Sequence, residues 1–135
     1  MSFDIAIIGA GSAGLSVAAA AAQFGEKVVL FEKGEMGGDC LNTGCVPSKA
    51  LLAAAKQAQA HRSSSKFGVA SHEPDIDFAK VMAHVERVIA AIEPHDSQDR
   101  FEGLGVTVVR AAARFTGPTT LEAQGKSYLA RRVVV

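Results

Sequence analysis

The stretch FDIAIIGAGSAG, residues 3–14, together with the segment that follows it as far as Glu32, decides the fold of this chain. An apolar run leads into closely spaced glycines and then into an alanine-rich stretch, an order that predicts strand, tight turn and helix. Gly25 stands where a helix terminator is expected, and the apolar run from Lys27 to Phe31 predicts a second strand. These elements predict a β-α-β unit with a parallel pair of strands.

The glycines of this stretch follow the spacing Gly-x-Gly-x-x-Gly of a dinucleotide-binding fingerprint. Gly9 permits a tight turn, Gly11 lets a pyrophosphate approach the backbone, and Gly14 lets the helix pack closely on the sheet. The helix then begins at Ser12 and Ala13, whose backbone N–H groups are directed at the phosphates. The alternative is that the glycines serve only a strand-to-helix turn.

Glu32 ends the second predicted strand, 18 residues beyond Gly14. A carboxylate about 20 residues after the fingerprint accepts hydrogen bonds from an adenosine ribose in dinucleotide-binding domains, and it repels a 2′-phosphate. Glu32 therefore completes the fingerprint, which by itself does not distinguish FAD from NAD.

Cys40 and Cys45 are the only cysteines, so the chain is no disulfide scaffold and the close spacing indicates a local redox or metal pair. Across five residues a regular helix rises about 7.5 Å, beyond the roughly 7 Å Cα separation that a disulfide spans. A bonded pair therefore requires a distorted or non-helical segment, for which Asn42, Thr43 and Gly44 are suitable. The alternative is an inert buried pair or an incidental disulfide.

Residues 34–43 are rich in glycine and polar side chains and predict a loop, followed by a helix that begins near Pro47 and runs towards His61. Cys45 then lies just ahead of that helix. The positive end of the helix dipole and the ammonium group of Lys49 are expected to stabilise a thiolate there.

Apolar residues at intervals of three and four from Phe78 to Ile92 predict a helix that faces the core. Asp77 is placed as its N-cap, and Pro94 is expected to end or kink it. Beyond this helix we expect a buried strand at 106–109, hairpins within 113–128 and a final apolar strand at 133–135.

The composition favours one domain that recognises a specific ligand. Of the 135 residues, 48% are apolar, which suffices for one core, and 14 basic residues balance 14 acidic ones. That balance provides no overall field for nucleic acid or an anionic membrane. The uncharged stretch from Ile5 to Gly25 is broken by glycines and preceded by Asp4 rather than by Lys or Arg, which argues against a membrane span. The four histidines, expected to form no constellation and to lie on the surface or on helix faces, are His61, His72, His84 and His95.

Residues 37–49, GGDCLNTGCVPSK, resemble the active-site signature of the flavin disulfide reductases. This group of pyridine nucleotide-disulfide oxidoreductases includes dihydrolipoyl dehydrogenase, glutathione reductase and mercuric reductase. With the fingerprint, the resemblance covers essentially the whole chain, and Asp39 and residues 94–97 are most similar to mercuric-reductase-like members. It implies an α/β fold over residues 1–135: a Rossmann-like FAD-binding domain, incomplete, with a parallel sheet, helices and a small β-meander near the carboxy terminus.

The resemblance also implies how the site is used. Cys45 is expected to face the flavin as the charge-transfer thiolate, and Cys40 to be the interchange thiol that attacks an external disulfide or binds a metal. Electrons are expected to pass from NAD(P)H through FAD to this pair, and then to a disulfide or metal-ion substrate. The residues implied to hold the cofactor are Gly9, Gly11, Ser12, Ala13, Gly14, Glu32, Lys33, Gly37, Gly38, Lys49 and Ala113.

In that family a nicotinamide-binding domain and a dimerisation domain follow, and the latter lends a histidine base to the partner subunit. Neither is present here, so we expect this chain to be an inactive fragment of a cytoplasmic, homodimeric enzyme. No resident metal, nucleic acid or membrane is expected as a partner. The alternative is a stand-alone dinucleotide-binding or thiol redox-sensing module.

Overall fold

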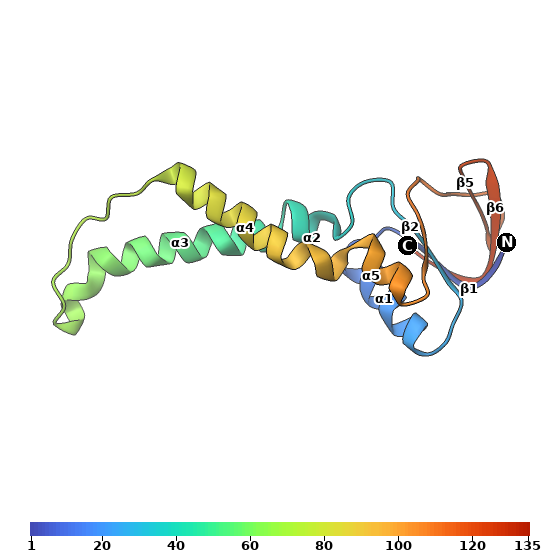
Figure 1. Ribbon diagram of the computed structural model, residues 1–135, viewed down its shortest axis with the longest axis horizontal. Helices are drawn as coiled ribbons and strands as arrows, with labels where there is room; N and C mark the ends of the chain where they lie inside the picture. Colours follow the sequence, from blue (N-terminus) through green and yellow to red (C-terminus); the bar gives the residue numbers. More distant parts are fainter.

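A mixed β-sheet and a long helical hairpin that projects from it make up the computed structural model, which describes all residues from 1 to 135 (Figure 1). The strands lie in the order β3-β2-β1-β6-β5-β4. The strands are β1 (Ser2–Ile8), β2 (Val28–Phe31), β3 (Thr107–Val109), β4 (Arg114–Phe115), β5 (Thr120–Ala123) and β6 (Lys126–Val134). The helices are α1 (Ser12–Gln23), α2 (Gly38–Asn42), α3 (Cys45–Ser63), the 3₁₀ helix η1 (Ser64–Phe67), α4 (Phe78–Asp96) and α5 (Gln98–Gly103).

The β-α-β unit predicted from the first 32 residues is confirmed. β1 and β2 pair in parallel, with Ile5 opposite Val28, and α1 connects them. Gly25 follows the helix with a φ of +81°, a left-handed conformation that glycine adopts without strain. The uncharged stretch is thus divided between a strand and a helix of this unit, and no helix of the chain is both long and apolar enough to span a membrane.

The central parallel strand β2 is buried on both faces, as is usual for parallel strands. On one face the sheet packs against α1 and α5, and on the other face residues of β5 and β6 take part in the packing. The first core includes Ile7, Leu15, Leu30 and Phe101. The second includes Phe3, Phe31, Leu121 and Tyr128, with the Phe31 and Tyr128 rings edge to face at 5.0 Å.

β6 joins the parallel and antiparallel parts of the sheet. Its Leu129 lies opposite Ser2 of β1 in a parallel pair, while Tyr128 lies opposite Leu121 of β5 in an antiparallel pair. The predicted hairpins and the predicted final strand are therefore confirmed, but they meet in one continuous strand. The result is the predicted α/β architecture, with a small meander of β4, β5 and β6.

The amphipathic helix predicted after residue 77 is present as α4, but it does not face the sheet core as predicted. It runs beside α3, and the two project together away from the sheet (Figure 1). Val85 is its only buried residue, and Phe78 is 63% exposed. The apolar periodicity describes a contact with another helix, because periodicity identifies a buried face without identifying what covers it.

Both ends of α4 are set by side chains. Asp77 caps its start as predicted, accepting a hydrogen bond from the Lys80 N–H at 3.1 Å. Pro94 does not end the helix, which continues to Asp96. A proline near the carboxy terminus of a helix removes only one backbone hydrogen bond of the last turns. The Pro94 carbonyl in turn accepts a hydrogen bond from the Ser97 hydroxyl at 2.9 Å.

Candidate cofactor and thiol site

The predicted site residues gather where the parallel strands end. The carboxyl ends of β1, β2 and β3 lie at one edge of the sheet, the place where ligands bind in open α/β sheets. Two hollows of about 350 and 420 Å³ lie there and share Ile8 and Gly9. The first is also lined by Phe31, Glu32, Lys33, Ala111, Ala112 and Ala113. The second is also lined by Ile7, Gly11, Ser12, Ala13, Gly14, Asp39, Cys40, Val134 and Val135.

The glycines make this edge accessible to backbone contacts. A Cβ atom at Gly14 would lie 1.9 Å from the Gly9 carbonyl oxygen, so only glycine lets α1 start so close to β1. A Cβ atom at Gly38 would lie 2.8 Å from Gly11 Cα, so the two glycine segments touch. Gly11 itself has open space where its side chain would be, on the side from which a phosphate would approach.

The amino end of α1 provides free donors to the larger hollow. The bond from the Leu15 N–H to the Gly11 carbonyl, at 2.9 Å, is the first of the helix. The N–H groups of Ser12, Ala13 and Gly14 therefore have no partner within the helix. No acidic residue lies in the first turn, so the positive end of the dipole is uncompensated. This arrangement suits an anion such as a pyrophosphate.

Glu32 lies at the junction of the two strands and the glycine loop. Its Oε2 accepts a hydrogen bond from the Ala10 N–H at 2.6 Å, and its Oε1 accepts one from the Gly34 N–H at 2.6 Å. The carboxylate thus braces the loop as well as lining the smaller hollow. Each oxygen keeps a further lone pair, which is available to a ribose hydroxyl.

The segment 34–43, predicted to be a loop, contains the short helix α2. Gly37 precedes it with a φ of +86°, and its N–H donates to the Ala10 carbonyl at 2.9 Å. Asn42, expected in an irregular turn, is instead the last residue of α2. Its side-chain amide donates to the carbonyls of Met36 and Gly38 at 3.0 and 2.8 Å. These side-chain contacts hold the helix, and glycine-rich composition does not reveal them.

The second helix of the signature also begins earlier than predicted. α3 starts at Cys45, so that Pro47 lies within its first turn, where the missing N–H has no helical partner to lose. Thr43 and Gly44 separate α2 from α3. A Cβ atom at Gly44 would lie 2.8 Å from the Asp39 carbonyl oxygen, which makes this break tight. The break satisfies the requirement that a bonded cysteine pair lie in a distorted segment.

The break brings the two free thiols together. Cys40 is half-buried beside the larger hollow and Cys45 is exposed. Hydrogen bonds from the Cys45 thiol, and then from the Ser12 hydroxyl, lower the pKa of Cys40, and the charge of Lys49 lowers it further. The hydrogen bond and the charge interaction between Cys45 and Cys40 raise the pKa of Cys45. In the chain without a bound ligand, the pKa of Cys40 is thus lowered, whereas that of Cys45 is raised, in contrast to the thiolate expected at Cys45.

Because the two thiols hold each other's pKa apart, removing either one is expected to shift the other in the opposite direction. In Cys45→Ala the pKa of Cys40 rises towards its ordinary value of about 8.5, since its strongest stabilising contact is lost. In Cys40→Ala the pKa of Cys45 falls, since the group that raises it is gone and Lys49 remains. Alkylation rates of the reduced, ligand-free variants against pH measure both shifts. An unchanged Cys40 midpoint in Cys45→Ala contradicts the pairing.

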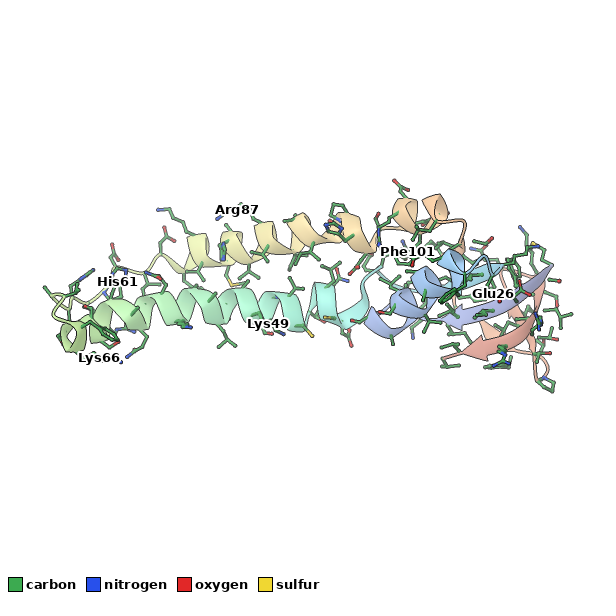
Figure 2. All side chains as sticks on the ribbon, turned by 90° about the horizontal axis from the view of Figure 1, so that it is seen from below. Glu26, Lys49, His61, Lys66, Arg87 and Phe101 are labelled. Atoms are coloured by element: carbon green, nitrogen blue, oxygen red, sulfur yellow. The ribbon has the colours of Figure 1, made fainter.

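The predicted site residues lie near one another, but some contacts among them were not predicted. Lys33 and Ala113 line the smaller hollow as expected, and Lys49 lies on α3 close enough to both thiols to lower the pKa of each (Figure 2). The missed groups are the Ser12 side chain, which contacts Cys40, and Arg110, which donates to the Gly34 carbonyl. No sequence pattern indicates either contact, because both join segments that only the tertiary fold brings together.

The fold is a Rossmann-like α/β arrangement, with a pair of adjacent thiols near the carboxyl ends of its parallel strands. Residues 3–135 match the Pyridine nucleotide-disulphide oxidoreductase family, and the chain belongs to that family. It is 36% identical over 121 residues to a mercuric reductase of Streptomyces lividans, covering 89% of this chain and 26% of that protein. It is 35% identical over 133 residues to a dihydrolipoyl dehydrogenase of Thermus scotoductus, covering 98% of this chain and 28% of that protein.

The chain thus spans about a quarter of the length of these relatives. The two relatives have different names, mercuric reductase and dihydrolipoyl dehydrogenase, at nearly equal identity. The comparisons therefore establish the oxidoreductase family and leave the substrate open.

Proposed function

We propose that this chain is the FAD-binding, redox-disulfide part of an NAD(P)H-dependent flavin disulfide reductase. In the parent protein, electrons pass from the nicotinamide through FAD to Cys40 and Cys45, and then to a disulfide or metal-ion substrate. We also propose that the parent is a cytoplasmic homodimer. The single observation that carries the proposal is the position of Cys40, which lines the same hollow as the glycine cradle and lies close enough to Cys45 for each thiol to shift the pKa of the other.

The hollows and their lining support FAD as the cofactor. The free N–H groups of α1 suit its pyrophosphate, and Glu32 has the free lone pairs that its ribose requires. Residues 111–113 line the smaller hollow with small side chains that leave room for an adenine. Bound there, FAD supplies an acceptor for two electrons from a nicotinamide and a donor of two electrons to a disulfide.

We assign Cys40 as the nucleophile for an external disulfide, because its pKa is lowered whereas that of Cys45 is raised. Its thiolate attacks one substrate sulfur, so that a mixed disulfide forms while the substrate S–S bond breaks and the leaving thiolate takes up a proton. Cys45 then attacks the Cys40 sulfur, which releases the second substrate thiol and leaves the Cys40–Cys45 disulfide. The two cysteines have then given two electrons to the substrate and are oxidised to a disulfide. Two electrons delivered through the cofactor reduce that disulfide and regenerate both thiols.

An anaerobic reductive titration tests the proposal. The oxidised chain is first loaded with FAD and then titrated with dithionite while its absorption spectrum is recorded. Because flavin and disulfide are each two-electron couples, the wild-type chain should take up two electrons for each of them. The Cys45→Ser variant, which retains the cradle, should take up only the two electrons of the flavin. Equal uptake by the two proteins, or no saturable FAD binding, contradicts the proposal.

We expect Glu32 to contribute to FAD affinity through its hydrogen bonds as well as through its charge. Replacing it by Ala removes a ribose acceptor and both braces of the glycine loop, so FAD binding should weaken by about 1.5–3 kcal/mol. Glu35→Ala is the matched control, since it removes an exposed carboxylate three residues away whose partner is Arg110 at 3.6 Å. Fluorescence titration measures both. If the two variants bind FAD alike, the ribose assignment is wrong.

A further inference from the structure

Two histidines that no sequence pattern connects lie side by side at the tip of the helical hairpin. His61 belongs to the last turn of α3, and His72 lies in the connection that leads to α4. Their ring centroids are 4.6 Å apart, with 57° between the ring planes. Figure 2 shows His61 at the end of the hairpin that is far from the sheet. The expectation that the histidines form no constellation is therefore wrong for this pair.

The connection is fastened to the end of α3 on both sides of the pair. The His72 N–H donates to the His61 carbonyl at 3.2 Å, so the two residues are also joined through their backbones. Next to them, Arg62 Nε donates to both carboxylate oxygens of Glu73 at 2.9 Å. The Ser65 N–H donates to the Ser71 hydroxyl at 2.8 Å. The histidines are thus held together by contacts that do not involve their rings.

The ring nitrogens remain available to a ligand. The side-chain hydrogen bonds at the tip are made by Arg62, Glu73, Ser64 and Ser71, and none involves an imidazole. Glu73 is committed to Arg62, whose hydrogen bonds lower the pKa of that carboxyl. Two adjacent imidazoles with no side-chain hydrogen bond can act as a chelating pair, because imidazole nitrogen is a preferred ligand of zinc, nickel and copper ions.

We propose that His61 and His72 together bind one divalent transition-metal ion, with water in the remaining coordination positions. A metal about 2.0–2.1 Å from one nitrogen of each ring brings the two ring centroids to roughly 4.5–5.5 Å from each other, and the observed separation lies in that range. The ion would link the end of α3 to the following connection.

This metal site is separate from the thiol site. His61 and Cys45 lie at opposite ends of α3, about 24 Å apart along the helix axis. A metal ion at the tip therefore contacts neither thiol, and the inference goes beyond the proposed redox function without depending on it.

Calorimetric titration with Ni²⁺ tests the proposal. The full chain carrying Cys40→Ser and Cys45→Ser is used, so that thiolates do not compete for the metal. We expect one saturable site per chain. Adding His61→Ala or His72→Ala should weaken the affinity by about tenfold or more, because the second ligand of a chelate acts at a high effective concentration. His84→Ala and His95→Ala are matched controls and should leave the affinity unchanged.

A second measurement identifies the ligands directly. In NMR spectra of the same protein, Zn²⁺ should shift the imidazole resonances of His61 and His72 and leave those of His84 and His95 in place. Circular dichroism of each variant confirms that the helices remain. The proposal is overturned if the chain shows no saturable binding, if the His61→Ala and His72→Ala double variant binds Ni²⁺ as before, or if the shifted resonances belong to other residues.

Discussion

Replacing Gly14 by alanine is expected to lower the free energy of unfolding by about 3 kcal/mol, at the upper end of the range for overpacked sites. The added methyl group would lie 1.9 Å from the Gly9 carbonyl oxygen and 3.2 Å from a side-chain carbon of Ile7. Neither neighbour can yield easily, since Gly9 directly follows β1 and donates its N–H to the Phe31 carbonyl of β2, and Ile7 is fully buried in the sheet. The strain therefore has to be relieved by moving α1 away from β1, which opens the first core.

Gly103→Ala is the matched control for this substitution. Gly103 is the last residue of α5, and a Cβ atom there would contact nothing within 4 Å. Alanine has a higher helix propensity than glycine by about 1 kcal/mol, so this variant should be as stable as the wild type or slightly more so. Urea denaturation followed by circular dichroism measures both free energies. Equal stability of the two variants would show that α1 does not depend on its close contact with β1.

The 135-residue chain, supplied with FAD and NADH or NADPH, is expected to show no steady turnover with a disulfide or metal-ion substrate. Hydride delivery requires a nicotinamide held within reach of the flavin, and positioning of that kind accounts for about 7–11 kcal/mol of an activation barrier. This chain contains one glycine fingerprint, whose hollows the proposed FAD would occupy. The loss of NAD(P)H absorbance on oxidation follows the reaction.

A histidine that could act as general acid for the departing thiol is also lacking near the cysteines. Such a group typically contributes 10²- to 10⁴-fold. His61 lies at the far end of α3 from Cys45, and no histidine lines either hollow. Dithionite provides the control, because it bypasses the nicotinamide and should still reduce bound flavin and the Cys40–Cys45 disulfide. Sustained NAD(P)H oxidation coupled to disulfide reduction, at rates of ordinary enzymes, would overturn this expectation.

The sequence by itself was enough to predict the β-α-β unit and to identify the glycine cradle and the pair Cys40 and Cys45 as candidate site features. Each depends on residues close together along the chain, where steric rules act directly. Gly14 is required by its contact with Gly9, five residues earlier, and Asp77 caps the helix that follows it. The order of such residues fixes local geometry whatever the rest of the chain does.

The tertiary structure alone decided what the local elements pack against. The apolar face of α4 predicts burial but not its partner, and the partner is α3 rather than the sheet. α2 likewise depends on Asn42 reaching back to Met36, a contact that composition does not reveal. The pKa of Cys40 is lowered first by Cys45 and then by Ser12, which lies 28 residues before Cys40. The pairing of His61 with His72 depends on the connection folding back onto α3. Such contacts join segments that are separate in the sequence. Their energies depend on the distances between these segments in the folded chain, which cannot be derived from the spacing of residues along the sequence.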